Sequence, residues 1–158
     1  MPYRTGIGFD IHRLVLDRPL VLGGVTIEYD KGLLGHSDGD VIIHAICDAI
    51  LGALSMGDIG ERFPDDSADT KDIYSIKMLE EIIDAISPSF NIMNIDSNCI
   101  CERPRLGIYR KEMVDQIAKA CRIETSQVCV KFRTHEGIGE IGRSEAIAAQ
   151  AVVMLKHR

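Results

Sequence analysis

The sequence of 158 residues is long enough for one domain that buries about two thirds of the surface of its unfolded chain. Its 46% hydrophobic and 27% charged residues are typical of a soluble globular protein, and no apolar run approaches the roughly 20 residues that a membrane helix needs. A formal net charge of −6 argues against a general nucleic-acid binder, whose affinity depends on many Lys and Arg contacts to phosphate, although a metal ion could still neutralise a phosphorylated substrate locally.

The N-terminal segment MPYRTGIGFDIH lacks the apolar stretch of a secretory signal, so we expect a cytoplasmic location. The five cysteines are odd in number and include no C-x-x-C pair, which indicates reduced thiols in the core. They are Cys47, Cys99, Cys101, Cys121 and Cys129.

The first predicted element is a strand over RTGIGFDIH. Since Asp10 and His12 are two residues apart, they project from the same face of such a strand. The next segment, PLVLGGVTIEYDKG, contains two short β-rich runs around Gly23 and Gly24, which predict a hairpin with positive φ values at its turn. We expect this hairpin to hold the following loop, LLGHSDGD, over the site.

A loop leading into an amphipathic helix is predicted for HSDGDVIIHAICDAILGALSMGDIG, because its apolar residues are spaced at three and four. The helix should run from about Asp40 to Ser55, with Ser37 or Asp38 as its N-cap.

Asp10, His12 and His44 are ligand types that suit zinc, and a site with three protein ligands leaves a fourth position for water or a substrate oxygen, as in catalytic zinc sites. The alternative is a hydrogen-bonded histidine pair at the surface of a strand and a helix. Asp40 and Asp48, one turn on either side of His44, would share its helical face and could orient its second ring nitrogen. Alternatively, these two are solvated helix carboxylates.

The first helix is predicted to break at MGDIG, where Gly57 and Gly60 permit a turn that carries Asp58. The following polar segment, ERFPDDSADT, predicts a mobile loop. From Lys71 to Ile86 apolar residues recur with helical period, so a second helix is predicted there, stopped by Ser-Pro.

The remaining segments complete one α/β domain over residues 1–158, without repeat or linker. Alternating polarity predicts a half-buried strand for FNIMNIDSNCICE, and QVCVKFRT is a further strand candidate. Between them, helical spacing predicts a helix from Leu106 to Ile123. The last segment, RSEAIAAQAVVMLKHR, is ambiguous between helix and strand, because its Ala-rich and β-branched runs disagree.

Three motifs, GFDIH, GLLGHSDGDVIIHAICDAILGAL and GDIGERFPD, resemble in order the signature of the 2-C-methyl-D-erythritol 2,4-cyclodiphosphate synthases, the cyclising enzymes of the non-mevalonate isoprenoid pathway. The resemblance implies an α/β fold of the α+β type. Its mixed sheet of four to five strands would have helices on one face and a small β-hairpin. The resemblance also favours a strand for the last segment, and it implies a homotrimer with active sites between subunits.

For the metal centre, the resemblance implies one Zn²⁺ per subunit, held by Asp10, His12 and His44 and touching the terminal phosphate of the substrate. It assigns His36 as a transition-state stabiliser and places Ser37 on substrate phosphate. The residues themselves allow this, because free N–H groups and the positive end of the following helix favour an anion, although N-capping is the alternative role for both.

The resemblance also implies two substrate-binding segments. The ribose and erythritol-phosphate parts of the substrate would be bound by Asp58, Ile59, Gly60, Phe63, Pro64, Asp65, Asp66 and Ser67. The cytosine would be bound through the main chain of CERPRLG, which comprises Cys101, Glu102, Arg103, Pro104, Arg105, Leu106 and Gly107. Arg105 stands where a lysine is common in the family.

The segment VKFRTHEGIGEIGRSEAIA resembles the last motif of the family. By this resemblance Thr134 stabilises the transition state and Glu136 binds a second divalent cation, Mg²⁺ or Mn²⁺. Substrate contacts at Arg133, His135 and Glu140 are implied at positions where the sequence departs from the usual pattern, whereas Arg143 keeps it.

The predicted function is an intramolecular phosphoryl transfer by a phosphorus–oxygen lyase. It would convert 4-diphosphocytidyl-2-C-methyl-D-erythritol 2-phosphate to 2-C-methyl-D-erythritol 2,4-cyclodiphosphate and release CMP. No nucleic-acid or membrane partner is expected. Two alternatives are a zinc phosphohydrolase that activates water at the open metal position, and a non-catalytic trimeric ligand-binding protein whose zinc only holds the loop.

Overall fold

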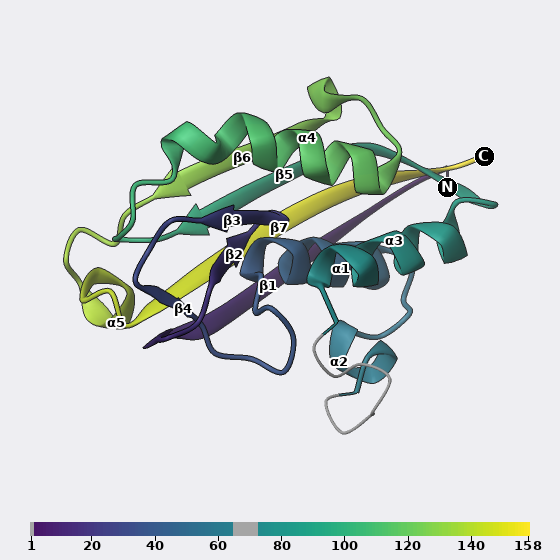
Figure 1. Ribbon diagram of the computed structural model, residues 1–158. Coiled ribbons are helices and arrows are strands. Elements are labelled where there is room, and N and C mark those ends of the chain that lie inside the picture. The colour runs from purple at the N-terminus through teal and green to yellow at the C-terminus, as the bar shows by residue number, and fades with distance from the viewer. Residues whose placement is uncertain (1, 65–72) are drawn as a thin grey trace.

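A mixed sheet of five strands, in the order β4-β1-β7-β5-β6, forms one layer of the computed structural model (Figure 1), which describes residues 2–64 and 73–158. All neighbouring strands are antiparallel except the parallel pair of β5 and β6, so the prediction of a mixed sheet is confirmed. The last segment, ambiguous in the sequence, is a strand. The strands are β1 (Tyr3–Leu16), β4 (Lys31–Leu33), β5 (Phe90–Ile100), β6 (Val128–Arg133) and β7 (Ala146–His157).

Three helices form the second layer and lie on one face of this sheet: α1 (Val41–Ala53), α3 (Ser75–Ile86) and α4 (Arg110–Cys121) (Figure 1). The core lies between the layers. Burying apolar side chains there is the main stabilising contribution to such a fold. Fully buried side chains from the helices include Ile42, Ile46, Ile50, Leu79, Ile82 and Met113.

The predicted hairpin is formed by β2 (Leu20–Leu22) and β3 (Val25–Ile27), with φ values of 59° and 74° at Gly23 and Gly24. Its turn is bonded to Asp40, whose carboxylate accepts from the backbone N–H of Gly23 at 2.9 Å and of Gly24 at 2.7 Å. These bonds tie the hairpin to the last residue of the LLGHSDGD loop.

The N-cap of α1 is Asp40, so the prediction of Ser37 or Asp38 was wrong. The Asp40 carboxylate also accepts from the N–H groups of Ile42 at 3.1 Å and Ile43 at 3.2 Å. One buried side chain therefore caps both the hairpin turn and the helix, which neither of the predicted residues does.

Two glycines of β1 allow α1 to rest directly on the strand. A Cβ atom added to Gly6 would lie 1.9 Å from the carbonyl oxygen of Ala49, and one added to Gly8 would lie 2.0 Å from that of Ala45. Any larger residue must therefore push the helix away. This close contact sets the distance between α1 and β1 next to His44.

The structure shortens and divides some predicted elements. Within the described residues, the second helix begins at Ser75, while Lys71 lies outside them. The predicted helix from Leu106 to Ile123 is a 3₁₀ turn, η1 (Gly107–Tyr109), followed by α4. Four further elements of three or four residues were not predicted, because they are too short for a periodic pattern. They are β4, α2 (Ile59–Arg62), the 3₁₀ turn η2 (Thr125–Gln127) and α5 (Gly139–Gly142).

The predicted loop over residues 61–70 lies partly outside the described residues, and its first two residues belong to α2. Four of the five cysteines are buried free thiols, as predicted. Cys129 is exposed instead, because it alternates with the buried Val128 and Val130 on the edge strand β6. No helix in residues 2–64 and 73–158 is long and apolar enough to cross a bilayer.

The two ends of the described chain lie side by side (Figure 1). Tyr3 pairs with Lys156 in the sheet, and the N–H of His157 donates to the carbonyl oxygen of Pro2 at 2.7 Å.

Candidate metal centre

The three predicted ligands converge between β1 and α1. The Oδ2 atom of Asp10 lies 3.0 Å from Nε2 of His12 and 2.8 Å from Nδ1 of His44. All three ligand atoms lie within 4.8 Å of one another. The prediction that Asp10 and His12 share a strand face is therefore confirmed, and both side chains meet His44.

The backbone fixes which nitrogen of His12 faces the centre. Its Nδ1 lies 2.5 Å from the carbonyl oxygen of Leu34, which can only accept, so Nδ1 carries the proton and donates. In the neutral ring, Nε2 then presents a lone pair to Asp10. This arrangement fits a cation, because a lone pair and a carboxylate oxygen 3.0 Å apart repel each other unless a proton or a metal ion lies between them.

The carboxyl group of Asp10 stays ionised at neutral pH. Burial raises its pKa, but the hydrogen bonds and charges of His12 and His44, in the form that holds a proton between each ring and Asp10, lower it more, so the pKa lies well below its usual range. An ionised carboxylate with two imidazoles is a donor set that zinc accepts.

Asp40 and Asp48 do not orient His44, so that prediction was wrong. Asp40 is engaged by the hairpin and the start of α1, and Oδ1 of Asp48 accepts from the N–H of Ile59 at 2.8 Å. Burial and the charge of Asp38 raise the pKa of Asp40 to about 6, against the lowering effect of its backbone donors. Both carboxylates bind backbone groups that only the tertiary structure brings near.

The other ring nitrogen of His44, Nε2, lies 2.8 Å from Oγ of Ser75 and 3.2 Å from Oγ of Ser37. No local sequence pattern points to Ser75, which is 31 residues away from His44 along the chain.

The N–H groups at the start of α1 were predicted to favour an anion. The Asp40 carboxylate takes two of them, those of Ile42 and Ile43. Ser37 does not cap the helix; its Oγ accepts from the N–H of Gly39 at 3.2 Å and contacts His44. A bound anion would therefore contact the side chains of the LLGHSDGD loop before it reached the N–H groups at the start of α1.

A cavity of about 210 Å³ adjoins the ligands. Asp48 and Met78 line it and were not predicted as site residues. Asp58, which was predicted to lie in a turn, is the N-cap of α2 and accepts from the N–H of Glu61 at 2.9 Å. The predicted residues Asp65, Asp66 and Ser67 lie outside the described part of the chain. The predicted residues that line the cavity are Asp10, His12, His36, Ser37, His44, Ile59, Gly60 and Phe63.

A second cavity, of about 520 Å³, lies at the ends of β5 and β6. It brings together the predicted segment 101–107 with Arg133, Thr134 and Glu136, and it adds Arg110 and Phe132, which were not predicted. The Thr134 hydroxyl donates to the Glu136 carboxylate at 2.8 Å.

Glu102 connects the two segments that form this second cavity. Its Oε2 accepts from the N–H of His135 at 3.1 Å and of Gly137 at 3.4 Å. The side chain thus holds the loop of Thr134 and Glu136 in place, a role that the sequence did not indicate.

The two cavities belong to separate parts of the sheet. The first adjoins β1 and the second adjoins β6, with β7 and β5 between them, which separates the two strands by roughly 14 Å. Glu140 lines neither cavity. Arg143 pairs with Glu145 at 2.8 Å and with Glu140 at 3.6 Å. One chain therefore does not bring all the predicted site residues together.

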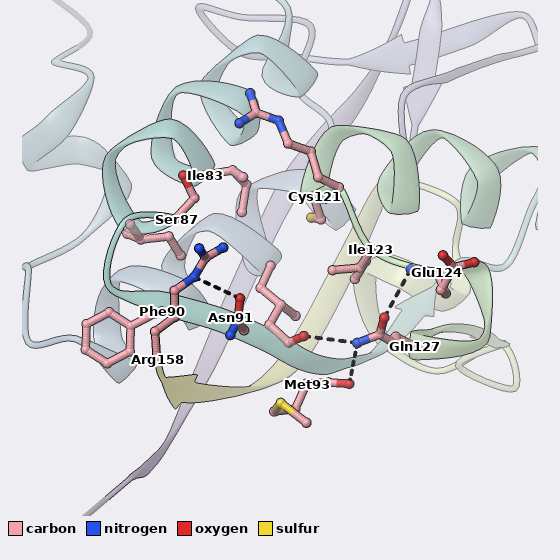
Figure 2. Close-up of a pocket in the computed structure, with 13 residues that line it drawn as sticks. Ile83, Ser87, Phe90, Asn91, Met93, Cys121, Ile123, Glu124, Gln127 and Arg158 are labelled. Atoms are coloured by element: carbon pink, nitrogen blue, oxygen red, sulfur yellow. Dashed lines mark hydrogen bonds between the residues drawn. The ribbon is translucent and has the colours of Figure 1, made fainter.

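Figure 2 shows another cavity, of about 510 Å³, between the ends of α3 and α4 and the start of β5. Several of its polar groups bond to one another. Gln127 donates to the carbonyl oxygens of Ile92 at 3.0 Å and Met93 at 2.9 Å, and Arg158 donates to Asn91 at 3.1 Å. Among the residues that the structure describes, none of those predicted for the site lines this cavity.

Comparison with known proteins assigns nearly the whole chain to one family. The YgbB family pattern matches residues 3–156. A 2-C-methyl-D-erythritol 2,4-cyclodiphosphate synthase of Desulfatibacillum aliphaticivorans is 52% identical over 154 residues, covering 97% of this chain and 99% of that protein. The synthase of the same name from Caldicellulosiruptor bescii is 49% identical, covering 97% and 98%.

Solved structures agree with these sequence relatives. The bifunctional IspDF from Campylobacter jejuni superposes with a TM-score of 0.94 at 39% identity, over 99% of this chain and 42% of that one. This chain therefore spans less than half of that bifunctional protein. The CDP complex of IspF from Plasmodium falciparum superposes with a TM-score of 0.88 at 37% identity, over 99% and 97%.

Proposed function

Since the chain belongs to the YgbB family, whose full-length relatives are 2-C-methyl-D-erythritol 2,4-cyclodiphosphate synthases, we infer that it is a phosphorus–oxygen lyase of isoprenoid precursor biosynthesis. It converts 4-diphosphocytidyl-2-C-methyl-D-erythritol 2-phosphate to 2-C-methyl-D-erythritol 2,4-cyclodiphosphate and CMP. The observation that best supports this function at the level of the site is the convergence of Asp10, His12 and His44 beside a cavity.

The reaction is an exchange of one phosphorus–oxygen bond for another. An oxygen of the 2-phosphate attacks the β-phosphorus of the diphosphate, and the bond to the α-phosphate oxygen breaks, so that CMP leaves with the bonding electron pair. Such a transfer needs little covalent participation by the protein, which mainly supplies positioning and charge neutralisation.

We assign the metal roles from the donor sets. Zn²⁺ held by Asp10, His12 and His44 would supply a Lewis acid with an open position for a phosphate oxygen. Mg²⁺ or Mn²⁺ held by Glu136 and the substrate phosphates would supply charge neutralisation at the leaving group. Oxygen ligands such as Glu136 suit these harder cations.

The protein groups do the remaining work. His36 and Ser37 line the cavity beside the ligands, where they can donate to phosphate oxygens. The Thr134 hydroxyl donates to the Glu136 carboxylate at 2.8 Å in the second cavity. It can rotate away from that carboxylate and donate to the negative charge that develops in the transition state. The segment 101–107 offers main-chain groups to the cytosine in the same cavity.

A homotrimer explains why the proposed site residues are divided between β1 and β6 in one chain. If the first cavity of one subunit faces the second cavity of its neighbour, a single substrate can reach both. The sheet face away from the helices carries exposed apolar side chains that such an assembly would cover. They include Ile7 at 64%, Phe9 at 56%, Ile11 at 48% and Val152 at 43% exposure.

Phe9→Asp should therefore dissociate the trimer and abolish turnover, while each chain still binds zinc. A charge placed in the apolar interface would be buried without a partner. Sedimentation velocity measures the mass, against wild type at three chains of 17.5 kDa. Leu16→Asp, at an exposed position near the end of the same strand, is the matched control and should remain trimeric. A monomeric wild type with full turnover would contradict this assembly.

The reaction itself is tested by incubating the purified protein with the cytidyl substrate and Mg²⁺ and identifying the products by mass spectrometry. We expect CMP and the cyclic diphosphate in equal amounts. Release of inorganic phosphate would favour the phosphohydrolase, and binding without turnover would favour the ligand-binding protein. The cytoplasmic location stays a prediction.

A further inference from the structure

Ser75, the first residue of α3, lies against the side of His44 that faces away from Asp10. Its side chain is fully buried, at 0% exposure, and its Oγ is 2.8 Å from Nε2 of His44. This serine comes from a helix that contributes no metal ligand, so its position beside the ring calls for an explanation.

The direction of the hydrogen bonds follows from Asp38. Both carboxylate oxygens of Asp38 face Ser75: Oδ2 accepts from the backbone N–H at 3.1 Å, and Oδ1 accepts a short bond from the hydroxyl. A carboxylate oxygen only accepts, so the single hydroxyl proton of Ser75 points to Asp38. The Ser75 oxygen can then only accept from His44, whose Nε2 must carry the proton.

This series of bonds determines the tautomer of His44. A neutral imidazole has one N–H group, so a proton on Nε2 leaves a lone pair on Nδ1. Nδ1 is the atom that lies 2.8 Å from Asp10 within the ligand cluster, where a bound metal ion would take the place of the proton that a contact with a carboxylate otherwise needs. Ser37 lies farther from Nε2, at 3.2 Å, and its Oγ also accepts from Gly39, so it adds less to this choice.

We propose that Ser75, held by Asp38, is a positioning residue that keeps His44 in the orientation and tautomer needed to bind the metal through Nδ1. This inference rests on the proposed zinc centre. Partners of this kind orient metal-bound imidazoles in other proteins, and their loss typically costs about 10-fold to 100-fold in metal affinity.

Ser75→Ala should weaken zinc binding by about 10-fold to 100-fold. The measurement is competition for Zn²⁺ with a chromophoric chelator, on the full chain and without substrate, so it does not depend on turnover. In the zinc-loaded protein, ¹⁵N shifts should show His44 bound through Nδ1 with its proton on Nε2 in wild type, and a fraction of His44 bound through Nε2 in Ser75→Ala.

Ser97→Ala is the matched control, because Ser97 is another buried serine, at 2% exposure, whose hydroxyl donates to the carbonyl of Cys129. It should keep wild-type zinc affinity. Asp38→Asn gives a second test. Its amide nitrogen cannot accept from one of the two donors of Ser75, which are the backbone N–H and the hydroxyl. This variant should weaken zinc binding less than Ser75→Ala does.

A folded Ser75→Ala protein with zinc affinity within about 2-fold of wild type would overturn the proposal, as would an equal loss in Ser97→Ala. If Ser75→Ala does not fold, unchanged zinc affinity and an unchanged His44 tautomer in Asp38→Asn would overturn it instead. A wild-type protein that binds no zinc would contradict the proposed metal centre itself, which distinguishes the two failures.

Discussion

His44→Ala should remove zinc from the purified protein and lower turnover by about a thousandfold or more. A Lewis-acid metal contributes several kcal/mol to stabilising a charged transition state, and each 1.4 kcal/mol corresponds to about tenfold in rate. Without the imidazole, the remaining ligands, Asp10 and His12, are too few for a stable zinc site. Metal content by atomic emission and steady-state kinetics measure the two effects.

Two other variants separate loss of zinc from loss of the second cation. Glu136→Ala should keep zinc and require a higher Mg²⁺ concentration, because Glu136 lies in the other cavity. His157→Ala removes an exposed histidine at the end of β7 and should leave both zinc content and rate unchanged. Unchanged zinc content and rate in His44→Ala would refute the proposed centre.

Gly8→Ala should destabilise the fold by about 3 kcal/mol or more, because the added methyl group overpacks a contact formed by backbone atoms. Its Cβ would lie 2.0 Å from the carbonyl oxygen of Ala45 and 2.8 Å from the nitrogen of Ala49. Since these are helix backbone atoms, α1 must move as a unit. Urea denaturation of the metal-free protein measures the loss.

Gly52→Ala is the control on the facing helix. A Cβ there would lie 3.9 Å from the carbonyl oxygen of Ile7, which is an ordinary van der Waals contact, so nothing must move. Alanine also favours the helix over glycine, so Gly52→Ala should be neutral or stabilise by up to about 1 kcal/mol. Equal stability of Gly8→Ala and wild type would show that the helix does not depend on this contact.

The sequence predicted the parts of the centre that depend on local spacing. Asp10 and His12 share a strand face because side chains alternate, and this holds in any strand that contains them. The glycine pair predicted the hairpin for a similar reason, since few other residues adopt the positive φ values of such a turn.

The errors concern side chains whose partners come from elsewhere in the chain. Helical spacing places Asp40 and Asp48 near His44, but Asp40 binds the hairpin turn and Asp48 binds the start of α2. Ser75 was missed for the same reason, because no local pattern relates it to a histidine 31 residues away.

The cap of α1 was misplaced because SDGD offers several side chains of similar capping propensity. Only the packing of the hairpin against Asp40 decides between them. The short elements β4, α2 and α5 are set by pairing and capping rather than by periodicity, so they could not be read from the sequence.

The adjacent ends of the described chain bear on how this domain can be joined to others. Asp10 is about 24 Å along β1 from Tyr3, and the second cavity is roughly 33 Å along β5 from Phe90, which pairs with His157. A second domain joined to either end of the chain would therefore start far from the metal-centre cavity and from the second cavity. A homologous unit makes up 42% of a bifunctional protein, and in this fold a segment attached at either end would start far from these cavities.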